Sequence, residues 1–359
     1  MNDSPFGHDF TDSRDLFVKS ARDAGARTES YSYPERGPLG EALSTEVAWI
    51  GPSDATNVLV MVSGTHGVEG FCGSGAQVDW LRRGEAKRLP KNSAAMLVHA
   101  LNPYGFAWLR RVTHENVDLN RNWVDFSQPL ARRLAYDEIA AALCPSQWDD
   151  DSRARNMLSL QGFIAKRGFP AFVEAVSGGQ YHHPDGLFFG GTEPTVARRT
   201  FESIFSDFLS RAHHIGIIDY HSGLGPLGFG ELMTSASTDS EEYTRARSWY
   251  GTCVTPVGSR ESASAIIGGD WIGAAPRLLP HATVTAIAIE FGTVAPLEVL
   301  DALRADNWLH RHADASKSWP GRIKIAMRDA FYVDSDVWRG MVLGQSLQVS
   351  RHAIGGLEA

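Results

Sequence analysis

Three short runs of almost uninterrupted apolar residues constrain the fold of this chain more than any other feature. They are VLVMV at 58–62, GIIDY at 216–220 and TAIAIEF at 285–291. Successive side chains of a strand point to opposite faces, so a strand that is apolar in both directions must be covered on both faces. Such strands are typical of a largely parallel sheet between two layers of helices. The runs therefore predict an α/β fold.

The segments between these runs carry helical patterns, with no repeat or linker that divides the chain. We expect strands at 46–50, 58–62, 96–101, 215–220, 231–234 and 284–291. We expect helices at 13–24, 75–83, 131–143, 195–211, 241–250, 296–312 and 321–333. This alternation predicts one three-layer domain over residues 1–359, whose mixed, largely parallel twisted sheet has helices on both faces.

One stretch, about 144–191, is less regular than the rest. It ends in SGGQYHHPDGLFFGGTEP, which is rich in glycine, aromatic and histidine residues. A long irregular segment inside a compact domain is commonly a functional lid or rim. We therefore expect a lid-like insertion here, with a purely structural insertion as the alternative.

Charge and composition narrow the classes of function. The chain has 34 basic and 42 acidic residues, a net charge of -8, whereas proteins that bind nucleic acids usually carry a basic face. Cys72, Cys144 and Cys253 lie far apart and form neither a disulfide framework nor a thiolate zinc site. No apolar run reaches the ~18 residues of a membrane span, and residues 1–17 lack a signal-peptide pattern. We expect a cytoplasmic protein without nucleic-acid or membrane partners, its oligomeric state open.

A histidine and a glutamate three residues apart follow the first apolar run. In SGTHGVEGF, His66 and Glu69 form an H-x-x-E pair after the strand at 58–62. Side chains three apart share one face of a helical turn, so an imidazole nitrogen and a carboxylate can meet at one ion. Sites of open α/β sheets form at the carboxyl ends of strands, where this pair is expected. By itself the pair also fits an ordinary helix surface.

Two later strands bring further polar residues to the same edge. His221 stands directly after GIIDY, with Asp219 two residues earlier, and can complete a His₂Glu site that leaves zinc a fourth position for water. Glu290 interrupts TAIAIEF, and a buried carboxylate is costly unless it is paired, coordinated or used in chemistry. A structural partner for an arginine is the alternative for Glu290.

An arginine-containing segment follows the strand at 96–101. The sequence NPYGFAWLRRVTHENVDLNRNW holds Arg110 and Arg111 and then a D-x-N-R-N group at 118–122. The planar fork of arginine binds a carboxylate or a developing oxyanion in a bidentate manner. A salt-bridged loop and helix start is the alternative interpretation.

Taken in order, these motifs resemble the zinc carboxypeptidase family, including its aspartoacylase and succinylglutamate desuccinylase branch. More narrowly, the chain is similar to a bacterial group of uncharacterised proteins allied to those enzymes. The resemblance spans 58–293 and implies the fold predicted above, with one zinc ion as cofactor. It implies that His66, Glu69 and His221 bind the metal, and that Glu290 is the general base.

The resemblance also implies residues that contact the substrate. Arg111, or its neighbour Arg110, corresponds to the arginine that helps zinc polarise the scissile carbonyl. Asn120 and Arg121 correspond to the pair that grips a free carboxylate. Tyr181, in the lid-like segment, is a further candidate for substrate binding. GGDW at 268–271 is reminiscent of a family segment that lines the specificity pocket.

Two departures separate the chain from the peptidases of that family. Residues 251–289 contain no tyrosine, where carboxypeptidases have a mobile one, and the segment around 181–191 has no obvious counterpart. The expected function is therefore zinc-dependent hydrolysis of an amide bond in a small or short-peptide substrate with a free carboxylate. Carboxypeptidase-like activity, N-acyl amino acid deacylation and a non-catalytic binding role on the same fold all remain open.

Two other patterns are interpreted as background. G-L-G-P-L-G at 223–228 matches a dinucleotide-binding fingerprint, but Pro226 and a strand-like sequence follow where a helix should start. His310 and His312 lie on a predicted helix two residues apart, and we expect both at the surface.

Overall fold

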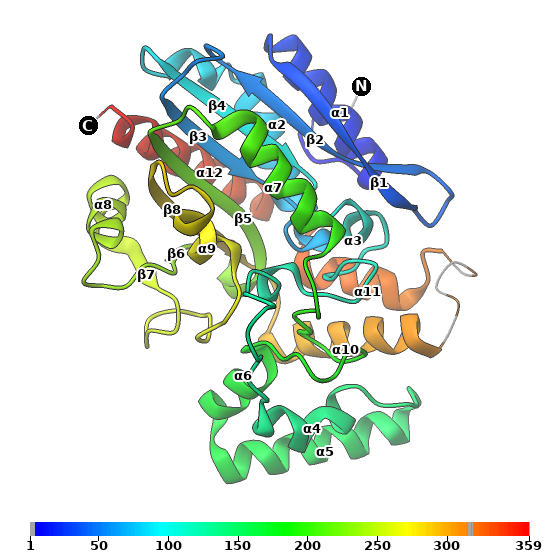
Figure 1. Ribbon diagram of the computed structural model, residues 1–359. Helices are drawn as coiled ribbons and strands as arrows, with labels where there is room; N and C mark the ends of the chain where they lie inside the picture. Colours follow the sequence, from blue (N-terminus) through cyan, green and yellow to red (C-terminus); the bar gives the residue numbers. More distant parts are fainter. Residues whose placement is uncertain (1–3, 313, 315–316, 318, 359) are drawn as a thin grey trace.

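The computed structural model describes residues 4–312, 314, 317 and 319–358. Residues 1–3 of the N-terminal segment, in which no signal peptide was predicted, lie outside the described residues. The predicted α/β architecture is confirmed, because one eight-stranded sheet carries helices on both sides (Figure 1).

The sheet has the strand order β1-β2-β4-β3-β5-β8-β6-β7. The strands are β1 (Arg27–Arg36), β2 (Ala42–Ile50), β3 (Asn57–Val62), β4 (Ser93–His99), β5 (His214–Leu227), β6 (Gly230–Thr234), β7 (Val254–Pro256) and β8 (Thr283–Gly292). The pairs β3–β4, β3–β5, β5–β8 and β6–β7 are parallel, and β1–β2, β2–β4 and β6–β8 are antiparallel. The sheet is therefore mixed and largely parallel, as predicted.

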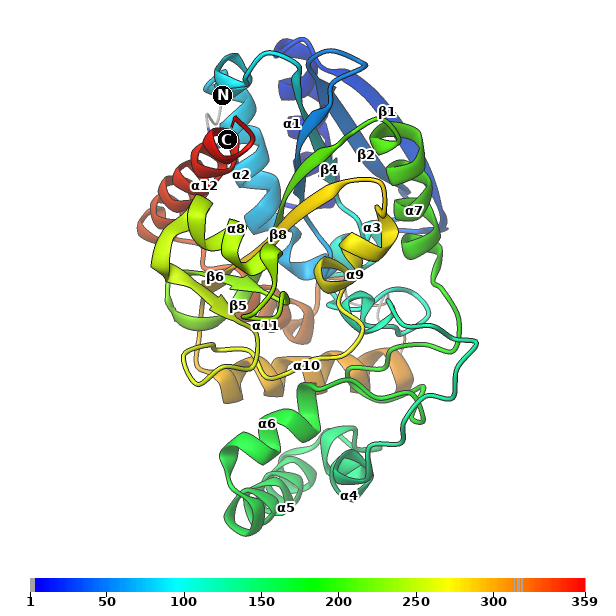
Figure 2. The same ribbon diagram turned by 60° about the vertical axis from the view of Figure 1, so that its left-hand side comes forward.

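The helices of the described residues either cover the two faces of the sheet or lie beyond its edge (Figure 1). They are α1 (Phe10–Asp23), α2 (Gly70–Arg82), α3 (Pro103–Ala107), α4 (Leu134–Leu143), α5 (Asp150–Arg167), α6 (Phe169–Ser177), α7 (Val196–Leu209), α8 (Glu241–Tyr250), α9 (Trp271–Leu278), α10 (Pro296–His312), α11 (Arg322–Phe331) and α12 (Asp336–Gly356). Figure 2 shows α2 and α12 on one side of the sheet and α7 and α9 on the other. The core lies in these two interfaces.

The three apolar runs are the adjacent central strands β3, β5 and β8. Their side chains are almost entirely buried, which accounts for the absence of polar alternation in the sequence. Because the three strands are parallel, their carboxyl ends meet at one edge of the sheet. The register aligns His221 of β5 with Glu290 of β8. This edge is where the candidate site forms.

The segment expected to be irregular, 144–191, is instead largely helical, so that expectation was wrong for 150–177. It contains α5 and α6, which pack with α4 into a three-helix unit, the helical cap (residues 134–177). The cap lies beyond the carboxyl ends of β5 and β8 (Figures 1 and 2). Helix α5 begins after the N-cap Asp149 and ends at Gly168, which is also the N-cap of α6. The φ of Gly168 is 87°, a value that favours glycine.

Several elements were not predicted, namely β1, β7, α3, α5, α6, α9 and α12. Helix α12 is the longest of them, with 21 residues. Its glycines disfavour an isolated helix, but α12 packs against α2 and α8, and this tertiary burial outweighs the low propensity. The G-L-G-P-L-G sequence continues strand β5 as far as Leu227 and is followed by β6, whereas a dinucleotide-binding fingerprint is followed by a helix.

His310 does not lie on the surface, which corrects the expectation from the sequence. Its side chain is 12% exposed, and its Nε2 lies 2.6 Å from Nζ of the buried Lys324. The reason is that α11 packs along α10, a contact that helical periodicity alone does not reveal. His312 is exposed, as expected.

The three cysteines are free, in agreement with the sequence. Within the described part of the chain, none of the helices has both the length and the apolar character needed to cross a bilayer.

Candidate metal centre

His66 and Glu69 are positioned by the turn that follows β3. His66 has an extended backbone and directly precedes a 3-10 turn, η1 (Gly67–Glu69), so the two side chains meet across one turn as predicted. The His66 Nδ1 atom lies 2.9 Å from Oε1 of Glu69. Backbone amides of this turn donate to the carbonyls of Arg110 and Arg111. A Cβ at Gly67 would lie 2.0 Å from the backbone of Gly105, so only glycine permits this close approach.

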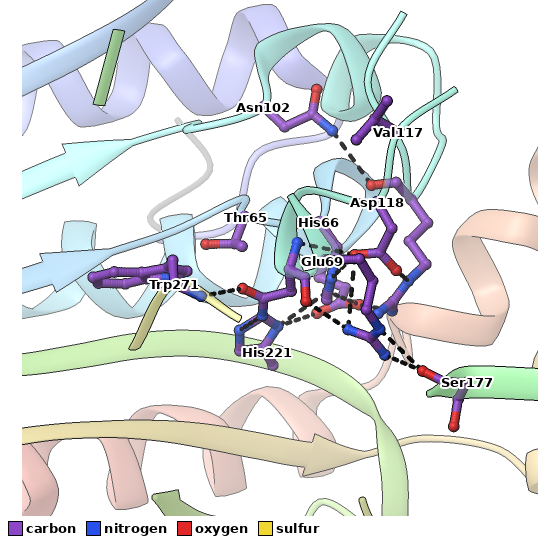
Figure 3. A network of polar contacts seen from close by, with 12 residues as sticks. Thr65, His66, Glu69, Asn102, Val117, Asp118, Ser177, His221 and Trp271 are labelled. Atoms are coloured by element: carbon purple, nitrogen blue, oxygen red, sulfur yellow. Dashed lines mark hydrogen bonds and ion pairs between the residues drawn. The ribbon is translucent and has the colours of Figure 1, made fainter. Parts of the chain in front are cut away.

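His221 of β5 completes a group of three ligand-type side chains. Its Nδ1 atom lies 3.2 Å from Nδ1 of His66 and 2.9 Å from Oε2 of Glu69. All three residues are buried, and among the described residues they are the group of three whose ligand atoms lie within 4.8 Å of one another. Figure 3 shows the three side chains converging from two separate strand ends. The structure thus brings together the three residues that the sequence singled out as ligands.

A carboxylate orients each of the two histidines. Asp118 Oδ1 lies 3.2 Å from Nε2 of His66, and Asp219 Oδ2 lies 2.6 Å from Nε2 of His221. When each Nε2 carries the proton and donates it to the carboxylate, each Nδ1 presents a lone pair to the centre. Metal-binding histidines are commonly oriented in this way.

Asp219 is a functional candidate that the sequence reasoning did not use. Its carboxylate also accepts hydrogen bonds from Oγ1 of Thr65 and Nε1 of Trp271, at 2.8 and 2.6 Å. Strand alternation could have indicated it, because residues two apart on β5, Asp219 and His221, point to the same face. Trp271 belongs to the GGDW sequence, so this segment supports the centre through the indole.

The donor set fits a zinc ion. Two imidazole nitrogens and one carboxylate are ligands that zinc prefers, and three protein ligands leave a position open for chemistry. Burial alone would raise the pKa of Glu69, but the neighbouring His66 and His221 outweigh it and hold this pKa well below the usual value. Glu69 is therefore an anion, and because each Nε2 is bonded to a carboxylate, the two Nδ1 atoms can join it as ligands of a cation.

Glu290 lies beside this group, on β8. Leu224 N donates to its Oε1 at 3.0 Å. Burial raises the pKa of Glu290 to about 8, and the negative charge of Glu69 adds to the effect. A carboxyl group with a pKa near neutrality is suited to taking up and releasing a proton.

The two adjacent arginines have different surroundings. Arg111 donates from Nη1 to Oε1 of Glu69 and from Nε to Oδ2 of Asp118, both at 3.0 Å. Arg110 donates from Nε to Asp306 at 3.1 Å. Of the two, Arg111 contacts the ligand group and lines the cavity described next.

The residues expected to grip a carboxylate lie beside the metal ligands. Asn120 Nδ2 is 3.5 Å from Nε2 of His221. Arg121 donates from Nε to the carbonyl of Ser177, at 3.0 Å, and from Nη1 to the carbonyl of Asn120, at 2.8 Å. Tyr181 donates its hydroxyl to the carbonyl of Arg121 at 2.8 Å. Tyr181 therefore supports the backbone of this loop.

A cavity of about 450 Å³ opens over the ligand group. It is large enough for a small organic molecule or a short peptide end. Its polar floor is formed by His66, Arg111, Asn120, Arg121, His221 and Glu290. The remaining lining is mostly apolar and comes mainly, though not entirely, from the helical cap, α10 and the 257–272 segment. The polar groups therefore converge in one place on an otherwise apolar surface.

Comparisons with known proteins place the chain in a family. Residues 6–345 match the family described as "Protein of unknown function (DUF2817)". No curated protein matches the sequence.

Two solved structures that are similar to the chain are a carboxypeptidase A from Helicoverpa armigera and a succinylglutamate desuccinylase from Chromobacterium violaceum. The first is 11% identical, with 97% of this chain and 74% of that chain covered and a TM-score of 0.46. The second is 12% identical, with 82% and 72% covered and a TM-score of 0.39.

Proposed function

The chain belongs to the DUF2817 family, and we propose that it is a zinc-dependent hydrolase of amide bonds that acts on a substrate with a free carboxylate. The observation that carries the proposal is the convergence of His66, Glu69 and His221 beneath a cavity, with Glu290 beside them. Zinc held by these three side chains would polarise the scissile carbonyl and make water more acidic.

Glu290 is the proposed general base. Its carboxylate takes a proton from the attacking water and delivers it to the leaving nitrogen, so that water and amide become a carboxylic acid and an amine. Its backbone partner, the Leu224 amide, fixes the carboxylate over the cavity floor.

Arg111 is the proposed oxyanion donor, through Nη2. Its Nε and Nη1 atoms are held by Asp118 and Glu69, so the guanidinium is already oriented before substrate binds. Removing one such donor typically costs on the order of 3 kcal/mol of transition-state stabilisation.

Asn120 and Arg121 are the proposed carboxylate-binding residues. Both line the cavity floor, and Arg121, whose Nε and Nη2 donate to the Ser177 carbonyl and whose Nη1 donates to the Asn120 carbonyl, has further guanidinium hydrogens that can bind a carboxylate. Arg110 and Tyr181, expected to contact the substrate, are engaged with Asp306 and with the Arg121 backbone respectively. We assign both to supporting positions.

N-acyl amino acid deacylation is the second candidate function. It is favoured by the absence of tyrosine from 251–289, where a carboxypeptidase would have one. The cytoplasmic location and the absence of nucleic-acid and membrane partners stay predictions.

The proposal is tested by metal analysis and a substrate screen. Purified protein should contain about one zinc per chain by elemental analysis, and His66→Ala should lose it. The zinc-loaded protein is then screened against blocked dipeptides and N-acyl amino acids, which separates the two activities. A chain without stoichiometric metal, or a metal-loaded chain that cleaves no member of either panel, would instead point to a non-catalytic binding protein.

A further inference from the structure

The helical cap supplies one wall of the cavity, and this wall is apolar. The residues of α6 that line the cavity are Phe169, Phe172, Val173, Val176 and Ser177. Four of these five side chains are hydrocarbon. The only acidic residue of α6, Glu174, is exposed to solvent. A substrate group next to α6 therefore meets hydrocarbon.

Two buried arginines fix the cap over the site. Arg121 binds the carbonyl of Ser177 at the carboxyl end of α6. Arg304 of α10 is fully buried and donates to the carbonyls of Ala142 and Leu143 at the end of α4, at 2.9 and 3.2 Å. Cations at helix carboxyl ends satisfy the last carbonyls and interact favourably with the helix dipole. The apolar wall is thus held in place by charged contacts.

Helix α10 provides the facing apolar surface. Leu297, Leu300 and Leu303 line the same cavity. Phe169 and Leu297 are 47% and 45% exposed, so the lining includes large apolar side chains that solvent reaches at the amino ends of α6 and α10. Large apolar side chains at the mouth of a cavity lower their free energy when an apolar ligand covers them.

The charged side chains that line the cavity are Arg111, Arg121, Asp270 and Glu290, all outside α6 and α10. Arg111 pairs with Glu69 and Asp118 in the floor. Asp270, on the far side of the floor, accepts from Ser235 Oγ and Gly273 N. None of these groups belongs to α6 or α10. A charged substituent placed between those two helices would lose its hydration without gaining a partner there.

We propose that the substrate carries a bulky apolar group that lies between α6 and α10, and that Phe172, Val173 and Val176 select for it. The preferred class is thus an amide whose acyl group or side chain is hydrocarbon, and a charged acyl group such as succinyl is disfavoured. This inference rests on the proposed function only in that the ligand occupies the same cavity.

Binding without turnover tests the inference. The Glu290→Gln protein, loaded with zinc, is titrated by calorimetry with two series of ligands. One is N-acetyl-, N-butanoyl-, N-hexanoyl- and N-succinylglycine, and the other is the N-acetyl derivatives of glycine, alanine, leucine, phenylalanine and aspartate. In at least one series, affinity should rise by up to about fourfold for each buried methylene. The charged member should bind more weakly than its hydrocarbon neighbours.

Val173 provides the variant that localises the effect. Val173→Thr keeps the shape of a partly exposed side chain but places a hydroxyl in the wall. It should weaken the longest apolar ligand roughly tenfold and leave N-acetylglycine unchanged. Val337→Thr is the matched control, because Val337 is 73% exposed on α12. It should change neither affinity.

The outcomes separate this inference from the proposed function. Flat affinities in both series, tightest binding of the succinyl or aspartate ligand, or no length-dependent effect of Val173→Thr would each overturn the apolar wall. A rising series together with failure of the wild-type protein to cleave any ligand would leave the wall standing and contradict the hydrolase.

Discussion

Two buried clusters of charged side chains lie near each other in this fold. They differ in the space beside them and in their balance of hydrogen-bond donors and acceptors. The candidate metal centre, called the metal centre below, contains His66, Glu69 and His221. The second, the lysine cluster, consists of Arg110, Asp306, His310 and Lys324. Both are built around a buried carboxylate. Only the metal centre faces the large cavity, whereas the space beside Arg110 and Asp306 is about 10 Å³, barely enough for one water.

The clusters also differ in their balance of donors and acceptors. In the lysine cluster, Asp306 accepts from Arg110 and Lys324, and Lys324 also donates to Nε2 of His310. Burial lowers the pKa of His310 to about 2, so the ring is a neutral acceptor. In the metal centre, the carboxylate of Glu69 and two Nδ1 atoms face one another. In the lysine cluster hydrogen-bond donors meet acceptors, whereas in the metal centre three ligand-type groups converge and could share a cation. This difference distinguishes a structural cluster from a binding site.

The largest expected effect is a loss of activity when Glu290, beside the metal centre, is replaced. Glu290→Gln should lower kcat by about 10²–10⁴-fold, because the amide cannot take the proton from water. Zinc content and the free energy of unfolding should change little, since Glu290 is not one of the proposed ligands and its raised pKa already disfavours the charged form. Turnover and elemental analysis provide the readouts. Full activity in the metal-loaded variant would show that Glu290 is not the base.

The reverse pattern is expected in the lysine cluster. Asp306→Asn leaves Arg110 and Lys324 buried without their counter-charge, and should lower the free energy of unfolding by about 3–5 kcal/mol. Zinc binding by the folded fraction should persist. Denaturant unfolding measures the loss, with Asp329→Asn as the control, because Asp329 is exposed in its pair with Arg328 and should cost at most ~1 kcal/mol. Equal free energies of unfolding for the two variants would show that the lysine cluster does not have the structural role assigned to it.

A smaller effect is expected when the carboxylate that orients the proposed metal ligand His221 is replaced. Thr65, Trp271 and His221 all direct hydrogen-bond donors at the two carboxylate oxygens of Asp219. In Asp219→Asn one of these oxygens is replaced by an amide nitrogen, which cannot accept. The orientation of His221 loosens, and zinc affinity should fall by about 10–100-fold. Competition with a chelating dye measures this affinity. An unchanged affinity would remove Asp219 from the metal centre.

The smallest effect is a pH dependence of stability in the lysine cluster. Burial lowers the pKa of Lys324 to about 8. The positive charge of Arg110 lowers this pKa further, and the negative charge of Asp306 raises it only in part. Between this value and the unfolded pKa of about 10.4, the unfolded chain binds more protons, so Lys324 makes stability rise with pH, by up to about 1.4 kcal/mol per pH unit. Unfolding from pH 7.5 to 10.5 should show a shallower rise in Lys324→Met, and identical slopes would contradict the assigned pKa.

Much of the site could be predicted because its residues sit at points that local sequence defines. His66, His221 and Glu290 each follow or interrupt an apolar run, and parallel strands bring such positions to one edge. The helical cap could not be predicted in the same way. Its helix α5 has few apolar residues, and its boundaries depend on the N-cap Asp149 and on Gly168. Short signals of this kind also occur in irregular segments.

The sequence by itself determined the α/β architecture and the residues that converge as candidate ligands, because strand burial and strand ends are written in local apolar patterns. Tertiary structure alone decided which arginine faces the cavity, since Arg110 and Arg111 are neighbours with the same chemistry and differ only in the partners that fold around them. It also decided that His310 is buried and that α6 gives the cavity an apolar wall. Those properties arise from contacts between segments distant in the chain, which no local pattern encodes.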